Sequence, residues 1–552
     1  MANDLPVGYY RDNFQFLLDF VLARYADLLS PAEQAYASGF GQLSLPAQRL
    51  YVRLALRKGP VFRSDKIAYA EIPACAAAAA ELMAAGYVDA GADAAYEVLL
   101  GLLVMPELRR LGPGLAGSGR AALVASLLAS TTVADFHASI SFKVYRPCHL
   151  VLLRTFRLLF FGNLQQDFTE FVLNDLGIMP YERYAIDANT RFFESRLIID
   201  QALQLADLGE RVMGWLETND REQLLGYTTH MPDPVEPGLQ RRLDRLSNRV
   251  ARQLERLAEP TAALAIYRRS CSGEARERQA RLLATVPDLV AGVSGVALEA
   301  ALAACWQIIE GPESEAELEF AVAFAARLYK KMAQPVPAAL PLLTPVVYPQ
   351  QQLVLLQVPG TRVELAVAEY FEAAGSQAHY VENSLFTALF GLAFWDIIFA
   401  PVRGAFFNPF QRRPADLFTP DFTLKRAAAL RARLAEVACK AALRARVLDA
   451  YGCKQGLANP FVNWSGISLQ LLELGLAQIP TNHLQVIFKR LLADPRANRS
   501  GFPDLVIFPP AGGYELVEVK APNDKLQANQ LRWLRCFAGA RIPHQVVNVL
   551  WR

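Results

Sequence analysis

The spacing of apolar residues along most of the chain predicts amphipathic helices, because it repeats every three to four positions instead of alternating. Residues 12–130 divide into short segments of this kind. Two helices are predicted at 46–58 and, rich in alanine, at 74–85, where Gly86 would end the second one. The N-terminal part is therefore expected to be a compact helical module.

Two further helical regions follow this module. Between residues 99 and 128, two apolar helices flank a glycine-rich turn at 112–119. This order resembles a SAP-type DNA-binding hairpin and is equally that of a structural helical hairpin. From about 150 to 370 the helical spacing continues. Segments within 251–284 alternate small and large residues as tetratricopeptide-like helix pairs do, but no regular repeat is found, so only degenerate repeats are expected. We expect a helical scaffold there.

The pattern changes near the C-terminus, where short runs rich in β-branched residues replace the helical spacing. Residues 504–508 and 514–520 predict two strands joined by a Pro-Pro-Ala-Gly-Gly turn. Asn523 can cap a helix from about 525 to 537, and 545–550 supplies another strand. This end of the chain is expected to be α/β.

Together the patterns predict a multidomain, mainly α protein with a C-terminal α/β domain. A length of 552 residues suits three to four domains. The expected parts are an N-terminal helical DNA-binding module at 1–92, a SAP-like helical module at 93–150, a tetratricopeptide-like helical scaffold at 151–372 and an α/β domain at 373–552.

Composition narrows the class of protein. Lys and Arg number 56 against 54 Asp and Glu, so any nucleic-acid surface must be a local patch. The seven cysteines stand singly, which argues against a disulfide framework and a zinc knuckle. The N-terminus has no apolar signal region and the chain has no uncharged apolar run of about 20 residues. We expect no membrane span and a cytoplasmic protein.

The predicted C-terminal hairpin carries the candidate catalytic residues. Side chains alternate along a strand, so Glu518 and Lys520 point to one face while Val517 and Val519 enter the core. Asp504 begins the partner strand, and pairing could place its carboxylate beside that of Glu518. Two carboxylates this close repel each other. Mg²⁺ or Mn²⁺ would relieve that repulsion and activate a water for attack on a phosphodiester.

The roles of the neighbouring groups stay open at this stage. The carbonyl of Val519 could add a metal ligand. Lys520 could orient or deprotonate the attacking water, or it could offset charge on the phosphate. On these residues alone, Glu518 and Lys520 could equally be an ordinary surface ion pair.

The arrangement of Pro503-Asp504 followed by Glu518-Val519-Lys520 resembles that of restriction-endonuclease-like PD-(D/E)xK nucleases. The strings RSGFPDLV at 499–506 and LVEVKAPND at 516–524, with Gln530 three residues before Trp533, resemble the VRR-NUC nuclease domain. The ion-pair alternative becomes a minor one with this resemblance.

The stretch VENSLF at 381–386 and the aromatic-rich segment after it resemble the helix that opens this domain in Fanconi-associated nucleases. Without the family, Glu382 is only an acidic residue in the first turn of a helix. The resemblance implies that Glu382 is a metal ligand and that Asp504, Glu518 and Lys520 are the other residues of the site. With the residue-based reasoning above, the expected metal ligands are Glu382, Asp504, Glu518 and the carbonyl of Val519, and the expected catalytic residues are Asp504, Glu518 and Lys520.

The likeness to this family extends to the N-terminal part of the chain, at 50–58 and 69–72. No segment resembles the ubiquitin-binding zinc finger of the animal members, which indicates a bacterial type. The resemblance implies an endonuclease that cuts branched, 5′-flap DNA in interstrand-crosslink repair, with 5′-to-3′ exonuclease activity as a further expectation. It would be nucleoid-associated in a bacterium and nuclear in a eukaryote.

Basic residues in two regions are candidate DNA contacts. Arg49, Arg53 and Arg57 are spaced to share one helix face, although an ordinary solvated face is the alternative. The full set is Arg49, Arg53, Arg57, Lys58, Arg63, Lys66, Lys489, Arg490, Arg499 and Gln530.

Two other functions remain as alternatives. One is a Holliday-junction-resolving or restriction-type nuclease, which would prefer four-way junctions or specific sequences. The other is a non-catalytic repeat scaffold that binds DNA. The six histidines lack metal-site spacing and the glycine-rich turn lacks a P-loop lysine, which disfavours a histidine metal site and nucleotide hydrolysis.

Overall fold

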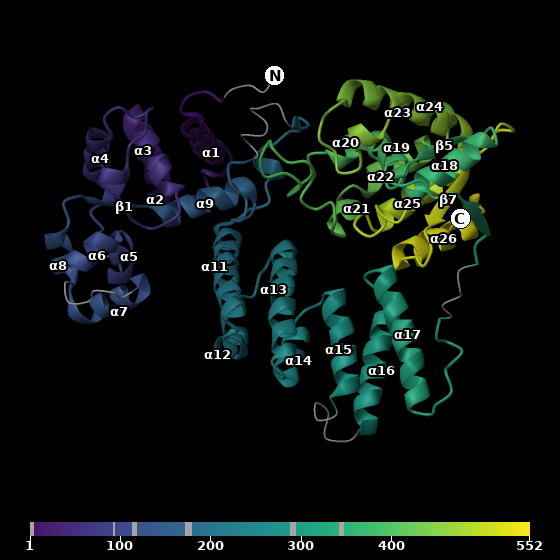
Figure 1. The fold of residues 1–552 in the computed structure, drawn as a ribbon, viewed down its shortest axis with the longest axis horizontal. Helices are drawn as coiled ribbons and strands as arrows, with labels where there is room; N and C mark the ends of the chain where they lie inside the picture. The colour runs from purple at the N-terminus through teal and green to yellow at the C-terminus, as the bar shows by residue number, and fades with distance from the viewer. Residues whose placement is uncertain are drawn as a thin grey trace. The chain divides into compact units, whose positions relative to one another are not determined.

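The computed structural model describes residues 5–91, 94–112, 119–169, 171, 179–286, 294–341 and 347–552. The chain divides into two compact units (Figure 1). The N-terminal unit contains Met1–Ile178 and Phe193–Ile199, and the C-terminal unit contains Met179–Phe192 and Asp200–Arg552.

The first part of the N-terminal unit is a helical bundle with a small antiparallel sheet, ordered β1-β3-β2. Its elements are α1 (Tyr9–Tyr25), α2 (Pro31–Gln42), α3 (Leu45–Ala55), β1 (Phe62–Arg63), α4 (Cys75–Ala84), β2 (Val88–Asp89), β3 (Val144–Pro147) and α9 (Leu150–Phe161). The alanine-rich helix is confirmed. The helix predicted at 46–58 ends at Ala55, so Arg57 lies beyond the helix and the prediction of one shared arginine face is wrong.

Four short helices make up the region predicted to be SAP-like. They are α5 (Tyr96–Gly101), α6 (Met105–Leu111), α7 (Arg120–Ser130) and α8 (Val133–Ser139). Leu99, Leu108, Leu123 and Phe136 pack in their common core. Positions 113–118 of the predicted turn lie outside the described residues, and the SAP assignment stays a prediction.

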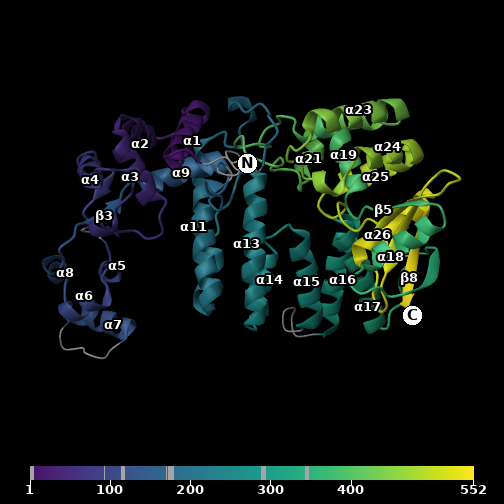
Figure 2. The same ribbon diagram turned by 45° about the horizontal axis from the view of Figure 1, so that its top comes forward.

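The C-terminal unit begins with successive helices, each of which packs against the next from α13 to α17 (Figure 2). They are α11 (Arg196–Thr218), which starts in the N-terminal unit, α12 (Arg221–Leu225), α13 (Pro237–Arg256), α14 (Pro260–Tyr267), α15 (Gly273–Thr285), α16 (Ser294–Glu310) and α17 (Glu315–Lys331). The expected helical scaffold is present, and the tetratricopeptide-like assignment stays a prediction.

The rest of this unit is a five-stranded mixed sheet with helices, as predicted for the C-terminal end. Strand order is β4-β8-β7-β6-β5, with β4, β8 and β7 parallel and β7, β6 and β5 antiparallel. The strands are β4 (Gln350–Leu355), β5 (Gln377–Tyr380), β6 (Leu505–Phe508), β7 (Glu515–Lys520) and β8 (His544–Trp551). Strand β4 lies before residue 373, where the α/β domain was expected to begin.

Helices cover both faces of this sheet. Helix α18 packs on one face through Val367, against Leu505, Val517 and Val519. The other face meets a larger core that includes Phe390 and Trp533. The helices are α18 (Val363–Ala373), α19 (Leu385–Ala393), α20 (Trp395–Ile398), α21 (Asp421–Lys425), α22 (Ala427–Glu436), α23 (Lys440–Lys454), α24 (Leu469–Gln478), α25 (Thr481–Ala493) and α26 (Ala528–Ala540).

The predicted cap of the last helix is wrong. Asn523 has a left-handed φ of 71° in the turn after β7, and α26 begins only at Ala528. The side-chain oxygen of Gln530 accepts a hydrogen bond of 2.8 Å from the backbone N–H of Gln527 and so completes the helix start. This places Gln530 in the first turn of α26, near the end of β7.

The structure bears on two expectations from the sequence, the state of the cysteines and the presence of a membrane-spanning helix. All seven cysteines are free thiols, as their spacing predicted. Within the described residues, no single helix is long and apolar enough to cross a membrane. One sharply bent pair, Arg120–Ser130 with Val133–Ser139, meets that test by length and composition.

Candidate active site

Strand pairing brings the two predicted carboxylates together. Leu505 of β6 pairs with Val517 of β7, so Asp504, just before β6, lies opposite Glu518. The Oδ2 atom of Asp504 accepts a hydrogen bond of 2.8 Å from the N–H of Val519. Asp504 is 8% exposed and Glu518 only 1%. The predicted arrangement is therefore present, in a buried setting.

Lys520 and Gln530 complete this group of side chains. The Nζ of Lys520 lies 2.8 Å from Oε1 of Glu518, and it donates a 3.0 Å hydrogen bond to Oε1 of Gln530. The side-chain amide of Gln530 donates a 2.5 Å hydrogen bond to Glu518. We call Asp504, Glu518, Lys520 and Gln530 the carboxylate centre. Gln530, proposed as a DNA contact, is held within it.

Burial makes the negative charge of this centre costly. Burial, with the nearby charge of Asp504, raises the pKa of Glu518 to about 8, although Lys520 acts in the opposite direction. Burial also raises the pKa of Asp504 to about 6 against the lowering effect of the Val519 N–H. Two buried carboxylates that resist ionisation favour an added cation, because a cation stabilises both charged forms.

Glu382 lies in the turn between β5 and α19, so the prediction that it occupies the first turn of a helix is wrong. The hydroxyl of Tyr380 donates a hydrogen bond to its carboxylate. The next residue, Asn383, has a left-handed φ of 51° and accepts a hydrogen bond from the N–H of Phe502. The turn is thereby tied to the segment that leads into Asp504.

Sequence reasoning missed two residues at the start of α18. Burial is the main cause of the raised pKa of Asp504, and the charges of Glu364 and Glu382 add to it. Arg362 lies 3.9 Å from Glu364 and places its guanidinium 5.2 Å from the ring of Tyr380. These residues precede the motif by about 140 positions, so only the packing of α18 on the sheet reveals them.

The centre offers hard oxygen donors of the kind that Mg²⁺ and Mn²⁺ prefer. Asp504 and Glu518 are the two buried carboxylates. The carboxylate of Glu382 is turned to Tyr380, and among the described residues no group of three acidic, histidine or cysteine side chains already forms a metal site. The donor set fits a divalent ion if Glu382 turns from Tyr380. The carbonyl of Val519 stays a predicted ligand.

The N-terminal arginines are largely engaged with other groups of the protein. Arg53 donates a 2.6 Å hydrogen bond to Glu71, and its guanidinium lies 4.0 Å from the ring of Tyr10. Arg49 donates to the backbone oxygen of Glu71 at 3.0 Å. Arg57 is exposed, with its guanidinium 5.3 Å from the ring of Phe62. Of the three, Arg57 is thus the most accessible to DNA.

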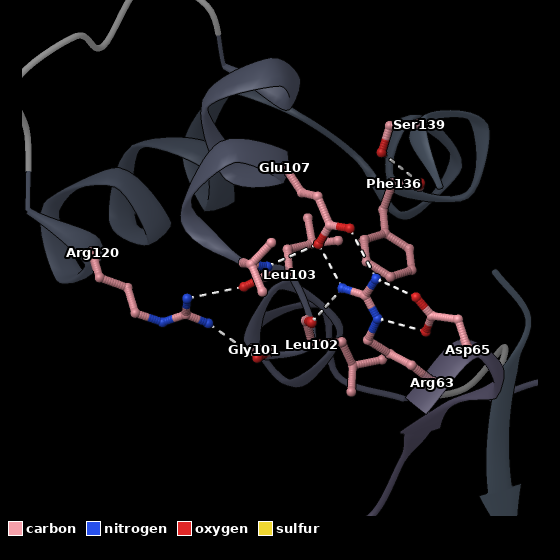
Figure 3. A network of polar contacts seen from close by, with 10 residues as sticks. Arg63, Asp65, Gly101, Leu102, Leu103, Glu107, Arg120, Phe136 and Ser139 are labelled. Carbon is pink, nitrogen blue, oxygen red and sulfur yellow. Dashed lines mark hydrogen bonds and ion pairs between the residues drawn. The ribbon is translucent and has the colours of Figure 1, made fainter. Parts of the chain in front are cut away.

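Arg63 is the centre of an ion-pair network with Glu107 and the more exposed Asp65 (Figure 3). Its guanidinium donates to Glu107 at 2.5 and 2.9 Å and to Asp65 at 2.8 and 3.0 Å. Its side chain is only 10% exposed. These contacts join β1 to α6, so Arg63 acts first as a structural link and its phosphate-binding role stays a prediction.

The remaining candidates differ in accessibility. Lys58, Lys66 and Lys489 are exposed. Arg490 forms a 2.6 Å ion pair with Glu315 and is mostly buried. Arg499 is exposed, and its guanidinium lies 4.9 Å from the ring of Phe418.

Comparisons with known proteins point to one family. A family model described as "FAN1, HTH domain" matches residues 8–89, which is the region predicted to be a helical DNA-binding module. A model of the VRR-NUC domain matches residues 439–551 and contains the carboxylate centre.

Individual relatives agree with the family models. The chain is 38% identical to the Fanconi-associated nuclease 1 homolog of Pseudomonas aeruginosa, over 98% of this chain and 96% of that protein. It is 26% identical to the homolog of Arabidopsis thaliana, over 95% of this chain and 65% of that protein. The crystal structure of paFAN1 bound to 5′-flap DNA with a 2-nucleotide flap and a gap matches with a TM-score of 0.84 and 36% identity, over the full length of both chains.

Proposed function

The chain belongs to the Fanconi-associated nuclease family, and from this premise we propose that it is a structure-specific endonuclease that cuts DNA at a 5′ flap. The observation that carries the proposal is the buried pair Asp504 and Glu518, with Lys520 against Glu518. Two related structures hold 5′-flap DNA with a gap, which supports the flap as substrate. Repair of crosslinked DNA is the proposed setting.

The proposed cofactor is Mg²⁺ or Mn²⁺. Asp504, Glu518 and Glu382, with the carbonyl of Val519, would hold it. When bound, such an ion supplies charge neutralisation and Lewis acidity, which favour attack of water on a phosphodiester. No comparable need for a cation arises at a surface ion pair, where water already solvates the charges.

The protein's own side chains prepare this chemistry. Lys520 presents an ammonium beside Glu518, where it can offset charge that develops on the phosphate or orient the attacking water. Gln530 contacts both Glu518 and Lys520 and so fixes their positions. Its place in the first turn of α26 makes that position part of the folded framework.

The test is cleavage of labelled DNA by the whole protein. A 5′ flap is compared with a 3′ flap, a four-way junction and plain duplex, each with Mg²⁺, Mn²⁺ or EDTA. Asp504→Ala is the inactive variant, and Glu369→Ala, which changes an exposed acid of α18 outside the motif, is its matched control. We expect cleavage of the 5′ flap that requires both a metal and Asp504.

Other outcomes would replace the proposal. Preference for the four-way junction would indicate a junction-resolving nuclease. Binding of DNA without cleavage of any substrate would indicate the non-catalytic scaffold. Cleavage that persists in Asp504→Ala would place the chemistry at another site.

A further inference from the structure

Helix α17, which precedes the five-stranded sheet in the chain, lies beside α26 and binds it through a carboxylate (Figure 2). The Oε2 atom of Glu319 accepts a hydrogen bond of 2.9 Å from Nε of Arg532, and its Oε1 atom accepts one of 2.8 Å from Arg535. Both oxygens of this one carboxylate are therefore held by arginines of α26.

A second carboxylate of α17 reaches α26 indirectly. Glu315, one turn before Glu319, forms a 2.6 Å ion pair with Arg490. The guanidinium of Arg490 lies 5.1 Å from the ring of Trp533, a buried residue of α26. Helix α17 is thus tied to α26 both directly and through α25.

Ion pairs, more than apolar packing, join α17 to α26. Phe320 and Ala323 of α17 face Ala528 and Leu531 of α26 across a cleft of about 400 Å³. The side chains of Arg532 and Glu319 are only 15% and 23% exposed, so water screens their attraction less than it screens a surface pair. The position of α26 against α17 therefore depends strongly on Glu319.

The start of α26 also carries Gln530, which belongs to the carboxylate centre. Residues two apart on a helix point to roughly opposite sides of its axis, so Arg532 can contact α17 while Gln530 contacts Glu518 and Lys520. A displacement of this first turn would change the hydrogen bonds that orient Lys520. Displacing a catalytic group by about 1 Å can lower a reaction rate by roughly a hundredfold.

We infer that Glu319 is a positioning residue for DNA cleavage, because it holds α26 where Gln530 orients Lys520 and Glu518. This inference rests on the proposed function for the reaction that is served. Glu319 acts through Arg532 and Gln530 and is not itself a catalytic residue.

The experiment measures cleavage of a labelled 5′-flap substrate in a single turnover, with the whole protein in excess and Mg²⁺ at saturation. The variants are Glu319→Ala, Gln530→Ala and the two combined. Glu310→Ala, which removes an exposed carboxylate at the end of α16, is the matched control. Binding of the same DNA is measured separately in EDTA.

We expect Glu319→Ala to cut about tenfold more slowly than the wild type and to bind DNA with an affinity changed by less than about twofold. Glu310→Ala should match the wild type. In the Gln530→Ala background, Glu319→Ala should lower the rate by less than about a further twofold, because the residue through which Glu319 acts is already gone. A wild-type rate in Glu319→Ala, or an equal loss in both backgrounds, would overturn the inference.

A melting curve shows whether Glu319→Ala still folds normally. If it melts well below the wild type, a charge exchange decides, because Glu319→Lys combined with Arg532→Glu rebuilds the ion pair in reverse. Faster cleavage in this double variant than in Glu319→Lys alone supports the inference. No recovery overturns it.

Hydrogen exchange of the backbone amides at 527–535, measured without DNA, separates this inference from the proposed function. Glu319→Ala should speed exchange at the start of α26 while exchange in β6 and β7 stays unchanged. If the wild type cuts no substrate, the proposed function fails and hydrogen exchange alone decides. Faster exchange then keeps Glu319 as the residue that holds α26, and unchanged exchange overturns the inference.

Discussion

The carboxylate centre and the N-terminal arginines show how differently two sequence patterns behave on folding. At the centre, Asp504 and Glu518 meet because neighbouring strands pair with the expected register. Near the N-terminus, Arg49 and Arg53 contact Glu71, and Arg63 contacts Glu107. The carboxylate pair formed as predicted, whereas most of the N-terminal arginines bind groups of the protein that are distant in sequence.

The difference lies in what each pattern requires. A hairpin needs only the alternation of side chains and a short turn, both of which depend on the local sequence. A basic residue can contact DNA only if no acidic group of the same protein already pairs with it. Such an acidic group can lie far away in the sequence. Charge spacing alone therefore predicts binding surfaces less well than strand motifs predict catalytic pairs.

The largest expected effect tests the catalytic side of this comparison. Lys520→Met should lower the rate of flap cleavage by about a hundred- to a thousandfold, because it removes the only cation that contacts Glu518 within the described residues. DNA binding in EDTA should change by no more than a few fold. Lys525→Met, an exposed lysine beyond β7, is the control. Equal cleavage rates in both variants would show that Lys520 has no catalytic role.

The next effect tests the structural role of an N-terminal arginine. Arg63→Met should lower the free energy of unfolding of the N-terminal unit by about 3 kcal/mol, because Glu107 and Asp65 then lose a buried partner. Urea denaturation followed by circular dichroism measures it. The exposed Arg57→Met should cost less than about 0.5 kcal/mol. If Arg63→Met weakens DNA binding without lowering the free energy of unfolding, Arg63 is a DNA contact and not a structural link.

Measuring the stability of the protein against pH tests whether the two carboxylates of the carboxylate centre have raised pKa values. The pKa values of Glu518 and Asp504, about 8 and about 6, exceed their ordinary values of 4.5 and 3.8, so the folded protein without metal holds these protons more tightly than the unfolded chain. This contribution is complete at low pH and is lost as the pH rises. Stability in EDTA should fall by on the order of 2 kcal/mol between about pH 5 and about pH 8.

Metal and mutation provide the controls for that titration. Mn²⁺ should restore the stability lost at the higher pH, because a cation replaces the protons. Glu518→Gln should show a shallower decline in EDTA and less recovery with Mn²⁺. Parallel curves for wild type and variant would mean that Glu518 ionises normally.

The smallest effect distinguishes two N-terminal arginines that differ in exposure. Arg57→Ala should weaken DNA binding a few fold and reduce the salt slope by roughly 0.9, because Arg57 is exposed. Arg53→Ala should change the slope less, since Glu71 already holds its charge. Anisotropy titrations at several salt concentrations compare them. Unchanged binding in both variants would remove this face from the proposed DNA surface.

Most of the architecture could be predicted from the sequence. The helical scaffold, the hairpin of β6 and β7 and the final strand follow from local periodicity. The predicted bounds of the helices near Ala55, Asn523 and Glu382 were wrong. At α26 the contact that completes the helix start is local, because Gln530 accepts from the N–H of Gln527, but periodicity alone did not identify which side chain makes it.

The sequence by itself determined the catalytic group, because the alternation of strand side chains and the motif around Asp504 and Glu518 are local properties. It could not assign Gln530 to that group, nor Glu364 to its electrostatics, because both reach it through helices packed on the sheet. Glu319 and the two arginines of α26 likewise meet only in the folded chain. Tertiary structure decides which charges are neutralised and which remain for a ligand, since ion pairing depends on distance in space.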